Sequence, residues 1–99
     1  MLPKNKSLTY QGEDLICALK DIELILISLH KIGSYYIDKN QDEYAKETCK
    51  FIDEWNVTQR LANVRSILVD KFDSSLGDDD MDDIERSMID LPYWAPDNK

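Results

Sequence analysis

Few side chains in this 99-residue sequence have the types and spacing that catalysis requires. The single histidine, His30, lies two residues after Ser28, but no motif supplies the oriented partner that a general base or a nucleophile needs. Neither Cys17 nor Cys49 lies in a neighbourhood arranged to activate a thiolate, so we expect both to be buried, structural and reduced. The sequence therefore indicates a protein that is not an enzyme.

Metal and cofactor sites are also not expected. Asp78, Asp80 and Asp82 match the first, third and fifth ligands of a calcium-binding loop. The match then fails, because position six is Asp83 instead of glycine and position twelve is Ile89 instead of glutamate. The spacing of cysteine and histidine does not fit zinc, and the three glycines are isolated, so they make no phosphate-binding loop.

The strongest chemical signal is the position of the charge. Residues 70–90, called the acidic segment below, contain nine acids and two bases, and they carry -7 of the chain's net charge of -8. Such a field repels nucleic acid and anionic lipid and attracts basic proteins. The scattered bases elsewhere do not favour nucleic-acid binding either. We therefore expect a basic protein partner, while an acidic run that serves only solubility is the alternative.

Aromatic residues follow the acidic segment and could anchor such a partner. The acids are denser than helix capping requires, and their mutual repulsion does not help the fold. The predicted partner-binding residues are Asp78, Asp79, Asp80, Asp82, Asp83, Glu85, Tyr93 and Trp94. Tyr35 and Tyr36 are a second candidate contact, for which packing in the core is the competing interpretation.

Helices are the elements that must position these residues, because three glycines and three prolines are too few for a fold rich in turns. We expect an all-α fold of three to four packed helices, with residues 1–11 as a loose lead-in, residues 12–99 as a single domain, and a short aromatic C-terminal tail. Apolar spacing predicts one helix from Gly12 to a C-cap at Gly33 and a second after an Asn40 N-cap. A third follows Asn56 or Thr58, unless the second and third are one kinked helix.

The apolar stripes predict which faces pack. In the first helix the stripe recurs at spacings of four and three, at Leu15, Leu19, Ile22, Leu26 and Leu29. Asp78 to Asp80 are expected to cap a short fourth helix, which Pro92 ends. No apolar run is long enough for a membrane span and no signal peptide is recognised, so we expect a cytoplasmic protein.

Three stretches resemble the C-terminal part of bacterial contact-dependent growth inhibition immunity proteins. They are residues 64–73, residues 76–86 and the Leu-Pro-Tyr-Trp sequence at residues 91–94, within a range that spans about a third of the chain. The resemblance implies a cytoplasmic antitoxin that binds the C-terminal toxin domain of a matching effector, often a nuclease, and blocks it. Colicin-type nuclease immunity proteins are likewise small, acidic and helical, and some have a Tyr-Tyr pair. Tyr35 and Tyr36 precede the acidic region here, so that family's binding site is not transferred.

The expected mechanism is occlusion without turnover. The acidic segment would speed the encounter with a basic toxin surface, and Tyr93 and Trp94 would bury as anchors. The free protein would be a monomer. The alternative is a helical adaptor that self-associates through its apolar stripes, with the acids serving only solubility.

Overall fold

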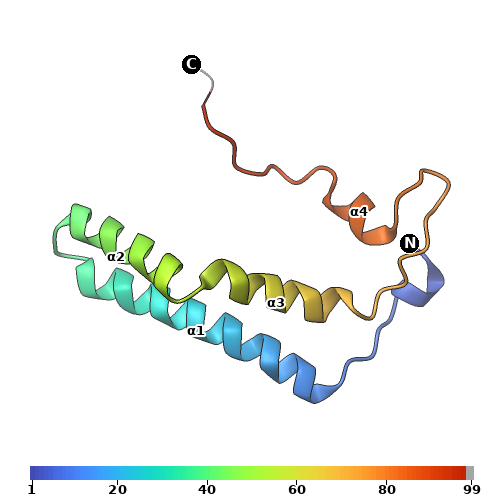
Figure 1. Ribbon diagram of the computed structural model, residues 1–99, viewed down its shortest axis with the longest axis horizontal. Coiled ribbons are helices and arrows are strands. Elements are labelled where there is room, and N and C mark those ends of the chain that lie inside the picture. Colours follow the sequence, from blue (N-terminus) through green and yellow to red (C-terminus); the bar gives the residue numbers. More distant parts are fainter. Residues whose placement is uncertain (98–99) are drawn as a thin grey trace. The chain divides into compact units, whose positions relative to one another are not determined.

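The structure, a computed structural model, describes residues 1–97 and is all-α in that range, as the sequence predicts. Its chain forms two compact units. The helical unit comprises Tyr10–Asp70, and the terminal unit combines Met1–Thr9 with the residues from Lys71 onward. The helical unit holds α1 (Gly12–Tyr36), α2 (Gln41–Glu54) and α3 (Val57–Val69), and the terminal unit holds η1 (Pro3–Asn5) and α4 (Asp83–Met88) (Figure 1).

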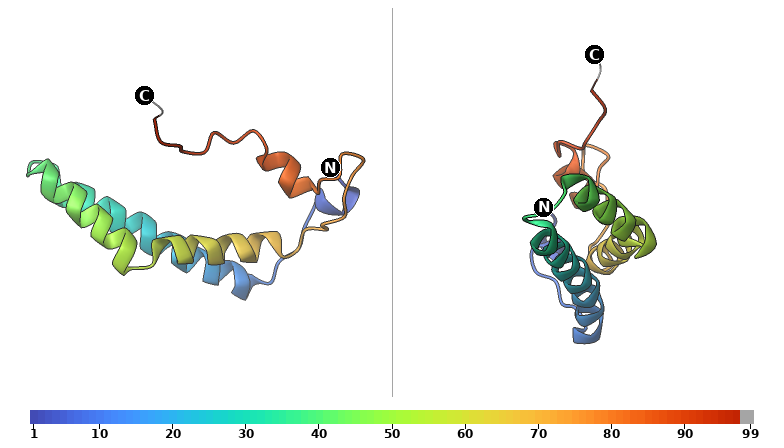
Figure 2. Two further views of the ribbon diagram at one scale, coloured as in Figure 1. Left: turned by 45° about the horizontal axis from the view of Figure 1, so that its top comes forward. Right: turned by 90° about the vertical axis from the view of Figure 1, so that its left-hand side faces the viewer.

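In the helical unit, α2 and α3 lie end to end along α1 and run antiparallel to it (Figures 1 and 2). Asn40 caps α2 as predicted, because its side-chain oxygen accepts a hydrogen bond from the Asp42 amide at 2.7 Å. Asn56 has a left-handed backbone conformation, at φ 52°, and therefore cannot continue the right-handed helix α2. The residues 41–69 thus form two helices and not one kinked helix. The unit is therefore a helical hairpin whose second arm is broken once.

The predicted end of the first helix at Gly33 is wrong. Gly33 does not have a positive φ, and α1 continues through it to Tyr36. A C-cap glycine ends a helix by adopting the left-handed conformation, and this one stays helical. The extra turn carries Tyr35 and Tyr36 at the end of α1, where they lie on the helix instead of in a connection.

The core of the helical unit is small. Ile25, Phe51 and Val57 form a buried cluster, against which the half-buried Leu24 and Ile32 pack. Ala18 and Val64 are also buried. No side chain in the described part of the chain is less than 2% exposed. Packing along one side of α1 therefore produces a thin core rather than an enclosed one.

The predicted core stripe of the first helix is also wrong in part. Leu19, Ile22, Leu26 and Leu29 are exposed, whereas Ala18 and Ile25 are buried. The helix is apolar around much more than half of its circumference, so periodicity alone gave two candidate faces. The arm formed by α2 and α3 covers the face that includes Ala18 and Ile25.

A polar clamp closes one edge of the hairpin. Asp21 of α1 accepts hydrogen bonds from the Arg60 guanidinium at 2.9 Å and from the Asn63 amide at 3.1 Å, both on α3. These two hydrogen bonds, that from Asn63 foremost, lower the pKa of Asp21. The clamp fixes which sides of α1 and α3 face one another.

The terminal unit includes the residues expected as a lead-in. Pro3–Asn5 forms a 3-10 helix, and Asn5 is 4% exposed. Its partners lie in the acidic segment, as described below. Helix α4 is only six residues long, so hydrogen bonds from side chains carry much of this unit's structure.

Candidate functional site

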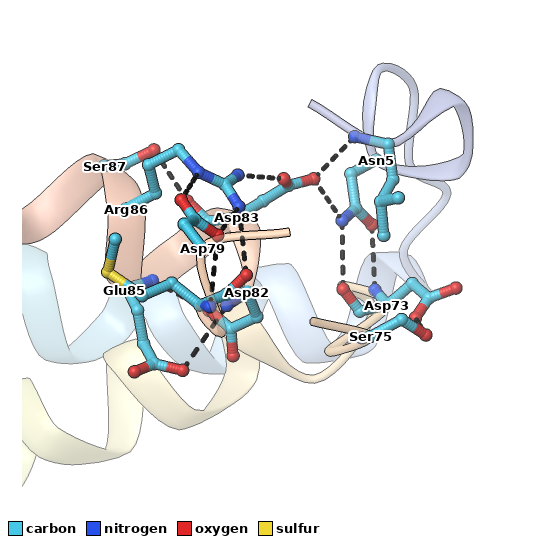
Figure 3. Close-up of polar contacts among 11 residues, drawn as sticks. Asn5, Asp73, Ser75, Asp79, Asp82, Asp83, Glu85, Arg86 and Ser87 are labelled. Carbon is cyan, nitrogen blue, oxygen red and sulfur yellow. Dashed lines mark hydrogen bonds and ion pairs between the residues drawn. The ribbon is translucent and has the colours of Figure 1, made fainter. Parts of the chain in front are cut away.

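Arg86 organises the loop that leads into α4 (Figure 3). Its Nε and Nη2 donate to the two carboxylate oxygens of Asp79 at 2.7 and 2.8 Å, and its Nη1 donates to Asp83 at 2.9 Å. Nη2 also donates to the Met81 carbonyl at 3.0 Å. The bidentate pair holds the pKa of Asp79 well below its usual range, and both carboxylates raise the pKa of Arg86.

The loop itself is tight around this guanidinium. The Gly77 amide donates to the Met81 carbonyl at 2.9 Å, and Asp80 adopts the left-handed region at φ 60°. A Cβ on Gly77 would lie 2.7 Å from Nη2 of Arg86. Glycine at this position therefore allows Arg86 to sit against the backbone and hold the loop closed.

Asp83 is the most enclosed of the predicted contact residues, at 5% exposure. Its Oδ2 accepts from the Asn5 amide group and from the Leu2 amide, each at 2.8 Å, while Oδ1 faces Arg86. These hydrogen bonds, that from Asn5 foremost, hold the pKa of Asp83 below its ordinary value. The carboxylate is thus a structural acceptor that joins the N-terminus to α4.

Asn5 connects the Asp83 side chain to the backbone of Asp73 (Figure 3). Its Nδ2 donates to the Asp73 carbonyl at 3.0 Å, and its Oδ1 accepts from the Asp73 amide at 2.8 Å. The Asp73 side chain accepts from the hydroxyl and the amide of Ser75, which lower its pKa, and lies 4.0 Å from the Lys4 ammonium. Segments from both ends of the sequence therefore meet at one asparagine.

Helix α4 begins with a capping box at Asp82 and Glu85. Glu85 donates its amide to the Asp82 carboxylate at 2.8 Å, and the Asp82 amide donates to the Glu85 carboxylate at 3.4 Å. The expectation that Asp78 to Asp80 cap this helix is therefore wrong. Those residues lie in the preceding loop, and the cap falls at Asp82, where the acid three residues later completes the box.

The predicted contact acids thus divide into two groups. Asp79, Asp82, Asp83 and Glu85 make hydrogen bonds within the terminal unit, as given above. Asp78 and Asp80 are exposed, and within residues 1–97 their carboxylates make no such bond. Arg86 neutralises part of the segment but leaves most of its negative charge. Among the predicted contact acids, the two whose carboxylates are left for a partner lie on the loop before α4.

Tyr93 and Trp94 are the most exposed aromatic side chains that follow this loop. They are 72% and 87% exposed, beyond the end of α4. Two adjacent exposed rings of this size offer a large apolar area to a partner. They belong to the same unit as the acidic loop.

The tyrosine pair belongs to the helical unit. The Tyr35 and Tyr36 rings meet edge to face with centroids 4.8 Å apart, and Lys39 places its ammonium 3.9 Å from the centroid of the Tyr35 ring. Tyr35 is exposed and Tyr36 is half-buried, and burial raises the pKa of Tyr36. Of this pair, only Tyr35 therefore has most of its side chain exposed to solvent and open to a partner.

The groups considered for chemistry lie on the surface. His30 is exposed, and Cys17 and Cys49 are exposed too, so the expectation of buried cysteines is wrong. At 100° per residue, Cys17 lies about 100° around α1 from the buried Ala18, and Cys49 lies on about the opposite side of α2 from the buried Phe51. Among residues 1–97, no group of three or more histidine, cysteine or acidic side chains is placed to hold a metal ion. No helix in that range is long and apolar enough to span a membrane.

Acid is expected to unfold the terminal unit, because Asp73, Asp79 and Asp83 all have lowered pKa values in the folded chain. A lowered folded pKa contributes stability that is present above the unfolded value, about 3.9, and is lost as the pH falls below it. The Gly77 amide resonance should therefore shift to its unfolded position below about pH 4. Asp79→Asn should flatten this profile, and Asp78→Asn should leave it unchanged. Identical profiles for both variants would contradict the role given to Asp79.

Comparison with protein-family models, with curated proteins and with solved structures finds no match for the chain. The functional argument therefore depends on the charge, the exposed aromatic residues and the packing described above.

Proposed function

We propose that this protein is a cytoplasmic immunity protein that binds and occludes the toxin domain of a contact-dependent growth inhibition effector. One observation carries the proposal. A highly acidic loop, held in shape by Arg86, precedes two aromatic side chains that are almost bare of protein contacts. Large exposed aromatic residues next to steering charges are typical of protein-binding surfaces. The resemblance at residues 64–73, 76–86 and 91–94 supports the same class.

In this proposal the two groups of acids have different tasks. Asp79, Asp82, Asp83 and Glu85 build the loop and the start of α4. Asp78 and Asp80 face the partner's lysine or arginine side chains, and the whole segment speeds the encounter. Tyr93 and Trp94 supply the buried anchors, and Tyr35 is the second candidate contact. The partner is a basic protein, for which a nuclease groove is the proposed example, and the mechanism has no turnover.

The direct test is whether this chain protects cells from the toxin domain. Cells that express the toxin domain encoded next to this gene should stop growing, and co-expression of this chain should restore growth. A purified complex should form with one toxin domain per chain. Normal growth arrest despite soluble, folded chain in the cell would overturn the proposal.

Trp94→Ala should weaken toxin binding by about 30-fold or more, since a buried aromatic anchor contributes at least about 2 kcal/mol. The matched control is Ile27→Ala, which also truncates an exposed apolar side chain but lies on α1. Isothermal titration calorimetry with the purified toxin domain measures the affinity of each variant. Equal affinities for the two variants would exclude Trp94 as an anchor.

Replacing Asp78 and Asp80 by asparagine should slow association and reduce its dependence on salt, with little change in dissociation. Stopped-flow measurements at several ionic strengths measure this. An unchanged association rate would assign the steering to other acids.

A further inference from the structure

The helical unit has an apolar face that no other part of that unit covers. Leu19, Ile22, Leu26 and Leu29 of α1 are between 38% and 59% exposed, and Leu61 and Leu68 of α3 are 48% and 42% exposed. These six residues are called the aliphatic face. A contiguous patch of this kind on a small chain usually marks an interaction surface.

Helical geometry places all six on one side of the hairpin. At 100° per residue, the buried Ile25 lies about 40° around α1 from Asp21. Leu26 and Leu19 lie farther around in the same direction, at about 140° and 160° from Asp21. Around α3, the buried Val64 lies about 40° from Arg60. Leu68 and Leu61 lie farther around in the same direction, at about 80° and 100° from Arg60. Since Asp21 and Arg60 pair across one edge of the hairpin, the leucines of both helices emerge at the opposite edge.

We propose that the aliphatic face is the interface between two copies of this chain, which pair the hairpins face to face. In the helical unit, acids outnumber bases by eleven to seven, and this excess opposes self-association on the sides that carry it. The aliphatic face does not share this excess. The ionisable residues that helical geometry places around it on α1 and α3 are Glu23, His30 and Arg65, which have no net charge with His30 neutral.

The neutral composition of this face also argues against the basic partner of the acidic segment as its occupant. A basic surface gains little from an aliphatic patch with no net charge, whereas an identical apolar patch is complementary to itself. Two hairpins stacked in this way have the layers of a four-helix bundle. Each thin core would then be covered on its open side.

The size of the face fits a small interface. Helix α1 has 25 residues and α3 has 13, so at 1.5 Å per residue and about 10 Å per helix diameter the two helices make a face of about 570 Å². Standard protein interfaces bury from roughly 600 to 1,000 Å² on each partner. In this proposal the free protein is a symmetric dimer, in place of the monomer expected from the sequence.

Light scattering coupled to size-exclusion chromatography tests this with the full chain alone, from about 1 μM to 1 mM. The wild type should have twice the mass of one chain at the upper concentrations. Leu26→Arg should raise the dimer dissociation constant by about 100-fold or more, because it buries an unpaired charge at the centre of the face. This variant also makes the chain less negative, so general charge repulsion cannot explain a loss of pairing.

Leu76→Arg is the matched control. Leu76 and Leu26 are both 59% exposed leucines, but Leu76 lies in the terminal unit. The control should remain dimeric, and circular dichroism should show the same helix content for both variants. A monomeric wild type up to the highest concentration, or a dimer that survives Leu26→Arg, would overturn the proposal.

Discussion

Replacing Asn5 with alanine is expected to unfold the terminal unit while α1, α2 and α3 stay folded. The side chain of Asn5 makes three hydrogen bonds, to Asp83 and to both backbone groups of Asp73. Each buried polar group left without a partner costs about 1–3 kcal/mol. A six-residue α4 and one 3-10 turn cannot compensate for such a loss.

Amide hydrogen exchange followed by NMR measures this loss in each unit separately. Protection at the amides of Asp73, Gly77 and Arg86 should disappear in Asn5→Ala, whereas protection in α1 should persist. Asn63→Ala is the control, because Asn63 also donates to an aspartate but is exposed and lies in the helical unit. It should leave the terminal unit protected.

A second variant separates shape from charge. Asn5→Asp preserves the size of the side chain and the acceptor for the Asp73 amide, but it puts a second carboxylate against Asp83. At neutral pH it should unfold the terminal unit as Asn5→Ala does, since the two negative charges repel and the donor is lost. Protection equal to that of the wild type in both variants would show that Asn5 does not hold the unit together.

Local patterns in the sequence predicted the helices well and their packing less well. The Asn40 cap could be predicted because a capping side chain bonds to an amide in the first turn of its own helix, here that of Asp42. The buried face of α1 was not, because Leu26 and Ile25 are equally apolar and only the position of α2 and α3 decides between them. The cap at Asp82 was within reach, since an aspartate three residues before Glu85 has the spacing of a capping box.

The candidate site shows the same division between local and distant contacts. The pair between Asp83 and Arg86 spans one helical turn, so its spacing could have revealed it. The contacts of Asn5 could not be found in this way, because they join residues 68 and 78 positions apart in the chain. A polar residue in a presumed lead-in gives no sign that it is buried.

Phe51→Ala is expected to have the largest effect on the helical unit. Phe51 is the largest member of the buried cluster with Ile25 and Val57, and it packs against Trp55 with ring centroids 6.0 Å apart. Truncation of a buried phenylalanine to alanine typically costs about 3–5 kcal/mol. Since whole domains are stable by only about 5–15 kcal/mol, a unit with this thin a core should lose most of its stability.

Urea denaturation followed by circular dichroism measures the loss, with Tyr44→Ala as the control. Tyr44 is an aromatic residue on the same helix, but it is 38% exposed, so its removal leaves a smaller cavity and should cost clearly less. The comparison shows whether the buried cluster or the exposed apolar residues contribute more to the stability of the hairpin. Equal losses for the two variants would mean that Phe51 has no special place in the core, and that the exposed apolar residues stabilise α2 as much as the buried cluster does.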